Sequence, residues 1–131
     1  MNNPELDLRQ TEDIVRQSSA NYEQFGFSDT EESLIDGLYV ELREYLQADE
    51  KDKMGELADV LYYTLNLADK KGYSLNTMLE YVFTKNMLRT NPNHVQAVMD
   101  ETGLDGVELY KECKRRADVN MGLRQEILEK L

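Results

Sequence analysis

Two pairs of acidic residues near the middle of the chain have the types and spacing of a metal site. Glu41 and Glu44 are three residues apart, as are Glu56 and Asp59, and eleven residues separate the two pairs. Residues three apart share a face of an α-helix, so each pair would point its two carboxylates in one direction. Carboxylates without accompanying histidine or cysteine suit hard divalent cations such as Mg²⁺ and Mn²⁺.

The two pairs are arranged symmetrically about residue 50, which predicts that they meet. A short polar connection centred there would make the flanking helices antiparallel neighbours. Glu44 would then lie level with Glu56, and Glu41 with Asp59. We therefore expect four carboxylates to converge in one pocket.

One acid of each pair, Glu41 and Glu56, stands in a helical stripe that is otherwise largely apolar, and Asp59 lies beside the second stripe. These stripes are Leu34, Leu38, Glu41 and Tyr45 on one helix, and Glu56, Val60, Tyr63 and Leu67 on the next. Two carboxylates about 5 Å apart repel by about 3 kcal/mol at an effective dielectric constant of about 20. A cluster of this kind must take up protons or bind a cation. The alternative is four ordinary solvated acids, since the chain has 26 acidic residues to draw on.

A cationic segment further along the chain could complement such a site. Lys85, Asn86 and Arg89 lie near the end of a helical pattern whose earlier positions are apolar. A polyphosphate bound through a metal needs cations of this kind to neutralise its remaining charge. The alternative is a solvated helix end, where cations interact favourably with the helix dipole.

Helices are the elements that must position these residues, because no period-two strand pattern occurs. Helical patterns cover about residues 4–24, 31–47, 53–71 and 75–91, followed by shorter ones at 95–101, 107–117 and 123–131. A capping box near Thr30 begins the second helix, and Gly72 ends the third. We expect an all-α fold, an antiparallel helical bundle with a four-helix core and extra C-terminal helices.

Composition narrows the possible partners and location. A chain of 131 residues fits a single domain, 1–131. The net charge of −11 disfavours binding to nucleic acid or to an anionic membrane surface. No apolar run approaches the about 20 residues that span a bilayer, and the first residues lack the pattern of a signal peptide. The single cysteine, Cys113, excludes an internal disulfide. A cytoplasmic location is the expectation.

The acidic motifs and the cationic segment together resemble the MazG-like superfamily of all-α nucleoside triphosphate pyrophosphohydrolases. Its signature, E-x-x-E followed after a gap by E-x-x-D, is similar to Glu41–Glu44 and Glu56–Asp59. The apolar run 60–63 and the segment 85–89 resemble the parts of the family pattern that follow. The resemblance covers about residues 30–92, which would be the motif-bearing core.

The resemblance implies cleavage of an NTP or dNTP between its α- and β-phosphates, giving the monophosphate and pyrophosphate. It implies that Mg²⁺, with Mn²⁺ as a substitute, is held by Glu41, Glu44, Glu56 and Asp59. Glu41 would also orient or deprotonate the attacking water, and Lys85 would join it as a catalytic residue. Lys85, Asn86 and Arg89 would contact the phosphates. A homodimer or homotetramer is also implied.

One departure and two rival interpretations remain. Many family members have an acid directly before the first motif glutamate, where this chain has Val40, so the number of metals and the general base stay open. Residues 72–75 resemble phosphoribosyl-ATP pyrophosphatase, which shares the motifs. The second rival is a non-catalytic acidic helical interaction protein, whose acids would spread over an outer surface and not converge.

Overall fold

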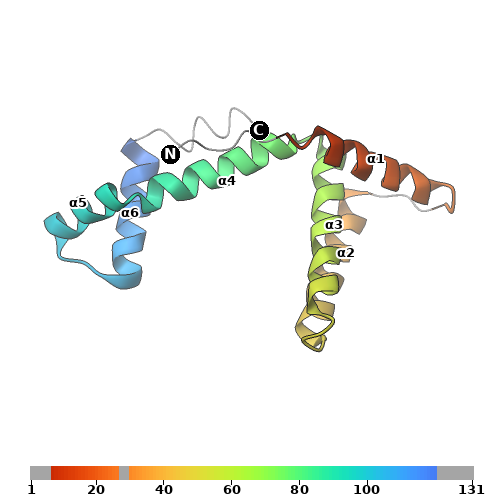
Figure 1. Cartoon of the computed structure of the whole chain (residues 1–131), viewed down its shortest axis with the longest axis horizontal. Coiled ribbons are helices and arrows are strands. Elements are labelled where there is room, and N and C mark those ends of the chain that lie inside the picture. Colours follow the sequence, from red (N-terminus) through yellow and green to blue (C-terminus); the bar gives the residue numbers. More distant parts are fainter. Residues whose placement is uncertain (1–6, 27–29, 121–131) are drawn as a thin grey trace. The chain divides into compact units, whose positions relative to one another are not determined.

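The computed structural model describes residues 7–26 and 30–120, and within these ranges the chain is helical without strands (Figure 1). Six helices follow one another: α1 Arg9–Glu23, α2 Glu31–Gln47, α3 Lys53–Lys71, α4 Leu75–Thr90, α5 Pro92–Thr102 and α6 Gly106–Asn120. The all-α prediction is therefore confirmed. The helix predicted at 123–131 and the first residues of the one predicted at 4–24 lie outside the described residues. No described helix is both long and apolar enough to cross a bilayer.

The helices fall into two compact units, Met1–Asn76 and Thr77–Leu131. In the first unit, α2 and α3 pack side by side as an antiparallel hairpin, and α1 packs on α3 (Figure 1). The second unit contains most of α4 together with α5 and α6, and its buried residues include Val98, Cys113 and Ala117.

Local signals fix the ends of the two helices that carry the acidic motifs. Thr30 caps α2 by accepting a hydrogen bond from the backbone of Ser33, whose side chain accepts one from the backbone N–H of Thr30. Gly72 ends α3 with a φ of +74°, a left-handed conformation that glycine adopts without steric cost. Both helices begin and end at the predicted residues.

The predicted stripes form the interface between α2 and α3. Leu34 is buried, and the other stripe residues of both helices are half-buried. Gly37 lies in the same interface, directly against the ring of Tyr63, so that an added Cβ would overlap the ring. The absence of a side chain at Gly37 lets the two helices approach closely at this point.

The first helix, α1, is attached to α3 by one apolar contact region and several polar contacts. Val15 is buried, and the hydroxyls of Ser18 and Tyr62 are hydrogen-bonded at 2.6 Å. Near the middle of α1, Nε of Arg16 donates to Oδ1 of Asp69 on α3 at 3.3 Å. These contacts place α1 on the side of α3 that carries Tyr62.

The close approach at Gly37 predicts that Gly37→Ala destabilises the protein. Alanine should add about 1 kcal/mol of helix propensity, but overpacking against Tyr63 should cost about 1–3 kcal/mol, so the net effect is a loss. Chemical denaturation followed by circular dichroism measures the difference. Gly55→Ala is the matched control, because nothing lies within 4 Å of its added Cβ, and it should stabilise. Equal stabilisation by both substitutions would contradict the prediction.

Candidate metal centre

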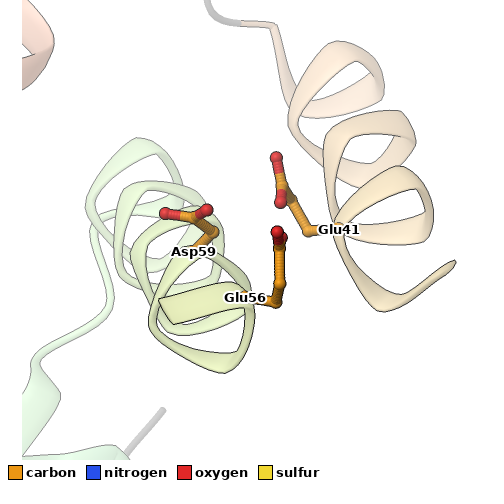
Figure 2. Close-up of side chains that lie close together, drawn as sticks. All are labelled: Glu41, Glu56 and Asp59. Atoms are coloured by element: carbon orange, nitrogen blue, oxygen red, sulfur yellow. The ribbon is translucent and has the colours of Figure 1, made fainter. Parts of the chain in front are cut away.

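Three of the predicted metal ligands converge between α2 and α3. Glu41 on α2 and Glu56 on α3 are half-buried, and Asp59 lies one turn along α3 at an exposed position. One carboxylate oxygen from each of the three lies within 4.8 Å of the others (Figure 2). This separation allows the three groups to share one cation.

The fourth predicted ligand, Glu44, also faces this group. It is within hydrogen-bonding reach of Glu41 and Glu56, and its charge acts on both. A cavity of about 650 Å³, open to solvent, lies beside the acids. It is lined by Glu44, Gln47, Ala48, Asp49, Asp52, Gly55, Glu56 and Asp59. All four predicted acids therefore meet at one place in the first unit.

The crowding disfavours the charged form of the two inner acids. Burial is the main reason that the pKa of Glu41 is raised, and the hydrogen bond and charge of Glu44 raise it further. Burial likewise raises the pKa of Glu56, followed by the charges of Glu44 and Asp59. In the absence of a cation, these carboxyl groups hold protons to a higher pH than an ordinary glutamate.

Two oxygen atoms of the cluster are buried without any hydrogen-bond partner, Oε2 of Glu41 and Oε2 of Glu56. Among the described residues, no lysine, arginine or histidine forms an ion pair with any of the four acids. Buried polar atoms are nearly always satisfied in folded proteins, so orphaned oxygens indicate a missing partner. An all-oxygen donor set fits Mg²⁺ or Mn²⁺.

The connection between α2 and α3 contributes acids that the sequence reasoning missed. Asp49 and Asp52 line the cavity, although they belong to neither motif. Their position in the sequence, between the two motif-bearing helices, could have indicated that they lie near the acids. Beside them, Nζ of Lys53 donates to the backbone oxygen of Tyr45 at 3.0 Å and lies 4.4 Å from the centre of its ring. Lys53 thus joins the two helices at the loop end of the hairpin.

The predicted phosphate-contacting residues lie in the second unit, so they are described separately from the acids. Nζ of Lys85 lies 4.8 Å from the centre of the Tyr81 ring. Asn86 is exposed, and its backbone oxygen accepts a hydrogen bond from the hydroxyl of Thr90 at 2.6 Å. That these residues contact the phosphates of a substrate bound at the acids stays a prediction.

Arg89 is engaged by an acid of α6. Its Nε and Nη2 donate to the two carboxylate oxygens of Asp118 at 2.9 and 2.7 Å. The side chains of Arg89 and Asp118 are only 13% and 23% exposed, and the pair lowers the pKa of Asp118 and raises that of Arg89. No local sequence signal pointed to this pair, because 29 positions separate the two residues.

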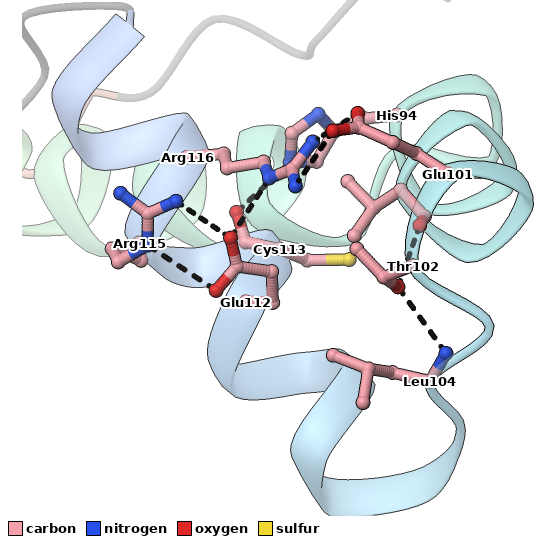
Figure 3. Close-up of polar contacts among 9 residues, drawn as sticks. His94, Glu101, Thr102, Leu104, Glu112, Cys113, Arg115 and Arg116 are labelled. Atoms are coloured by element: carbon pink, nitrogen blue, oxygen red, sulfur yellow. Dashed lines mark hydrogen bonds and ion pairs between the residues drawn. The ribbon is translucent and has the colours of Figure 1, made fainter.

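Other polar contacts in the second unit connect α5 to α6 (Figure 3). Arg116 donates to Glu101 at 2.6 Å and to Glu112 at 2.9 Å. His94 and the backbone oxygen of Cys113 are hydrogen-bonded at 2.8 Å. The two acids of this network, Glu101 and Glu112, are both paired with arginines. The described part of the network therefore has no unpaired acid that could bind a cation.

Comparison of the chain with protein-family models, with curated proteins and with solved structures returned no match. The interpretation of the acidic cluster therefore depends on its own chemistry and on the motif resemblance.

The raised pKa values predict how the metal-free protein responds to pH. A folded-state pKa above the usual 4.5 of glutamate means that the folded protein binds more protons than the unfolded chain above pH 4.5, so the cluster becomes destabilising as pH rises. Glu41→Gln should remove part of this repulsion. We expect its melting temperature, measured with a chelator present, to exceed that of the wild type by an amount that grows from about pH 4 to about pH 8.

The control for this measurement is Glu32→Gln, which changes an exposed acid in the first turn of the same helix. Its melting temperature should not rise above that of the wild type as pH rises, because a negative charge in the first turn of a helix is stabilising. A Glu41→Gln difference that is independent of pH would show that the inner acids are not crowded.

The half-buried pair in the second unit predicts that Arg89→Ala destabilises the protein by about 1–3 kcal/mol, because Asp118 would lose its counter-charge. Chemical denaturation measures this loss. Arg115→Ala is the control, since its pair with Glu112 leaves the arginine side chain 62% exposed, and exposed pairs contribute little. Equal effects of the two substitutions would contradict a structural role for the Arg89–Asp118 pair.

Proposed function

We propose that this protein hydrolyses a nucleoside triphosphate, NTP or dNTP, to the monophosphate and pyrophosphate in a reaction that requires Mg²⁺. The observation that supports the proposal best is the convergence of Glu41, Glu44, Glu56 and Asp59, with two buried oxygens lacking partners. A solvated helix acid has no reason to lie in a helix interface, whereas a metal ligand does. The same four residues carry the resemblance to the pyrophosphohydrolases.

The four acids would hold Mg²⁺, with Mn²⁺ as a substitute. The bound cation would neutralise phosphate charge and lower the pKa of a water molecule. Glu41 and Glu56 supply the buried oxygens, and Glu44 and Asp59 face the cavity. This division leaves the inner side of the site fixed by protein and its outer side open to a substrate.

The proposed reaction breaks the bond between the bridging oxygen and the α-phosphorus. The oxygen of a water molecule attacks the α-phosphorus, and pyrophosphate leaves with the electron pair of the broken bond. A base takes the proton of the water, and Glu41 is the proposed base. Its half-buried, acid-surrounded position disfavours its negative charge, and this makes it a better proton acceptor than a solvated glutamate.

An anionic substrate needs cations, because the first unit is strongly acidic. Residues 1–76 contain 17 of the 26 acidic residues but only 7 of the 15 lysines and arginines. Lys85, Asn86 and Arg89 are the proposed phosphate-contacting residues, with Lys85 also catalytic. Because Arg89 is already paired with Asp118, we expect Lys85 to contribute more to phosphate binding.

The proposal includes a homodimer or homotetramer as the working form and a cytoplasmic location. It includes neither nucleic acid nor a membrane as a partner, since a chain of net charge −11 repels phosphate backbones and anionic lipid. The family resemblance supports the homo-oligomer, and the composition supports the other expectations.

The test measures pyrophosphate release with Mg²⁺ across a panel of NTPs, dNTPs and phosphoribosyl-ATP. Glu44→Gln and Asp59→Asn should each lower turnover by at least about 100-fold, because each removes one carboxylate charge from the metal site. The same substitutions should reduce the rise in melting temperature that Mg²⁺ or Mn²⁺ produces in the wild type. Circular dichroism checks that the helices are retained.

Glu32→Gln again serves as the control and should leave both turnover and the metal response unchanged. Turnover of phosphoribosyl-ATP alone would assign the protein to the rival pathway enzyme. Turnover that persists in a chelator, or in both motif variants, would overturn the proposed function. Ligand binding without turnover or metal dependence would favour a non-catalytic interaction protein.

A further inference from the structure

The ion pair between Arg89 and Asp118 has further positive charge on both of its helices. Lys85 precedes Arg89 by four residues on α4, and Lys114 precedes Asp118 by four residues on α6. Residues four apart lie on the same face of a helix, about 6 Å from each other along its axis. Both lysines therefore lie one helical turn from the pair, on the faces that meet there.

The charges of both lysines act on Asp118. Hydrogen bonds from Arg89 are the main reason that the pKa of Asp118 is lowered, although burial opposes them. The positive charge of Arg89 lowers this pKa further, and so do the charges of Lys114 and Lys85. Three cations from two helices thus lie around a single carboxylate, and among these four residues positive charge is in excess.

The two lysines are also unlike the other cations of the second unit. Between residues 77 and 120, every other lysine and arginine forms an ion pair with an acid. Lys85 and Lys114 form none with any described residue. Nζ of Lys85 lies over the ring of Tyr81, and Lys114 is exposed. The two cations without an ion pair in this described part of the chain thus lie next to the same Arg89–Asp118 pair.

The second unit, taken by itself, is nearly neutral. Residues 77–131 contain 9 of the 26 acidic residues and 8 of the 15 lysines and arginines. The negative charge of the chain is therefore concentrated in the first unit. An anion is repelled less by the second unit, where the unpaired lysines attract it.

Arg89 has the donors that bind a phosphate group, and Asp118 occupies them. A guanidinium donates two parallel hydrogen bonds to a phosphate in the same way as to a carboxylate. Asp118 accepts such a pair of bonds from Nε and Nη2 of Arg89 at 2.9 and 2.7 Å. A phosphate that binds Arg89 must therefore replace this carboxylate or share the guanidinium with it.

The arrangement suits an anion with several charges. Lysine ammonium groups bind phosphate as compact point charges, and here they lie one turn from the ion pair on two different helices. A chain of two or three phosphates carries more charge than a single phosphate and extends over more donors. The chemistry at this place therefore favours an oligophosphate.

We propose that Lys85, Arg89 and Lys114 form an oligophosphate-binding site where α4 meets α6, with Asp118 competing for Arg89. Lys114 is a phosphate-binding residue in addition to those of the proposed function, and Asp118 limits the affinity of the site. The identification of the oligophosphate with a nucleotide rests on the proposed function. Binding itself requires neither Mg²⁺ nor the acids of α2 and α3, so it is measured separately from turnover.

Isothermal titration calorimetry of the full chain tests this site, with a chelator present to prevent metal binding. Tripolyphosphate, pyrophosphate, orthophosphate and an NTP are the probes. The wild type should bind tripolyphosphate more tightly than orthophosphate, and added salt should weaken the binding, because salt screens exposed charges. Lys114→Gln should weaken tripolyphosphate binding by about 10-fold, since one charge-assisted contact is lost.

Arg115→Gln is the matched control, because it removes the same charge at the next position of α6. Arg115 points about 100° away from Lys114 around the helix and pairs with Glu112. Its substitution should change the affinity for tripolyphosphate by less than about 2-fold, because an exposed charge on another face contributes little.

Asp118→Asn gives a result that a purely structural ion pair would not give. Removal of the competing charge should tighten tripolyphosphate binding by about 5-fold or more, because the half-buried Arg89 is left without a counter-charge. Circular dichroism checks that the helices are retained. If this variant does not fold, the comparison of Lys114→Gln with Arg115→Gln still decides whether the site exists.

Absence of tripolyphosphate binding overturns the proposal, as does equal weakening by Lys114→Gln and Arg115→Gln. Weaker binding by a folded Asp118→Asn variant overturns the competition. Tighter binding of the NTP than of tripolyphosphate supports a nucleotide as the ligand, and equal binding supports a site for the phosphate chain alone. Binding without any turnover in Mg²⁺ would support this site and contradict the proposed function, whereas turnover by a protein that binds no tripolyphosphate would do the reverse.

Discussion

The crowding of carboxylates in the interface between α2 and α3 is the constraint around which the first unit is organised. Glu41 and Glu56 occupy positions in apolar stripes, where their burial raises their pKa values and leaves one oxygen of each without a partner. Such an interface is stable only if other contacts offset the repulsion or a cation relieves it. Two contacts between the helices flank this cluster along the hairpin. Gly37 lies directly against Tyr63 on one side of it, and Lys53 contacts Tyr45 on the other.

The position of a residue in the helical period decides which side of the α2–α3 hairpin it faces. Residues at the contact positions hold the two helices together and include the two inner acids. Residues just before them supply Glu44, Asp59 and the contact with α1. Residues just after them, such as Leu42 and Leu57, are exposed and apolar. A change of one position in a 3.6-residue period rotates a side chain by about 100°, so neighbours in sequence serve different surfaces. One pair of helices can thus present a polar cavity and exposed apolar side chains on different sides.

The second unit combines a small buried apolar core with ion pairs between its helices. Arg89 and Asp118 join α4 to α6, and Arg116 joins α6 to α5. The half-buried Arg89–Asp118 pair fixes orientation, because a guanidinium with two hydrogen bonds to one carboxylate permits little rotation. The pair also means that Arg89 does not present a free positive charge, and any anion it contacts must share it with Asp118.

Features that local interactions control were predictable from residue types and their spacing. Capping at Thr30, the left-handed turn at Gly72 and the 3.6-residue apolar period placed both ends of α2 and α3 and identified their facing stripes. The symmetry about residue 50 then brought Glu41, Glu44, Glu56 and Asp59 together, because a short connection leaves two helices little choice but to pack antiparallel. The convergence of the four acids was in this sense a local prediction.

Contacts between residues far apart in the sequence could not be predicted in this way. The hydrogen bond of Ser18 with Tyr62 and the pairing of Arg89 with Asp118 depend on how whole helices pack, and no short-range pattern encodes either. The same holds for the extent to which each acid is exposed: the stripes single out Glu41 and Glu56, but only the packed helices leave these two half-buried and Asp59 exposed. Burial is a property of the surroundings, and those are assembled only when the helices meet.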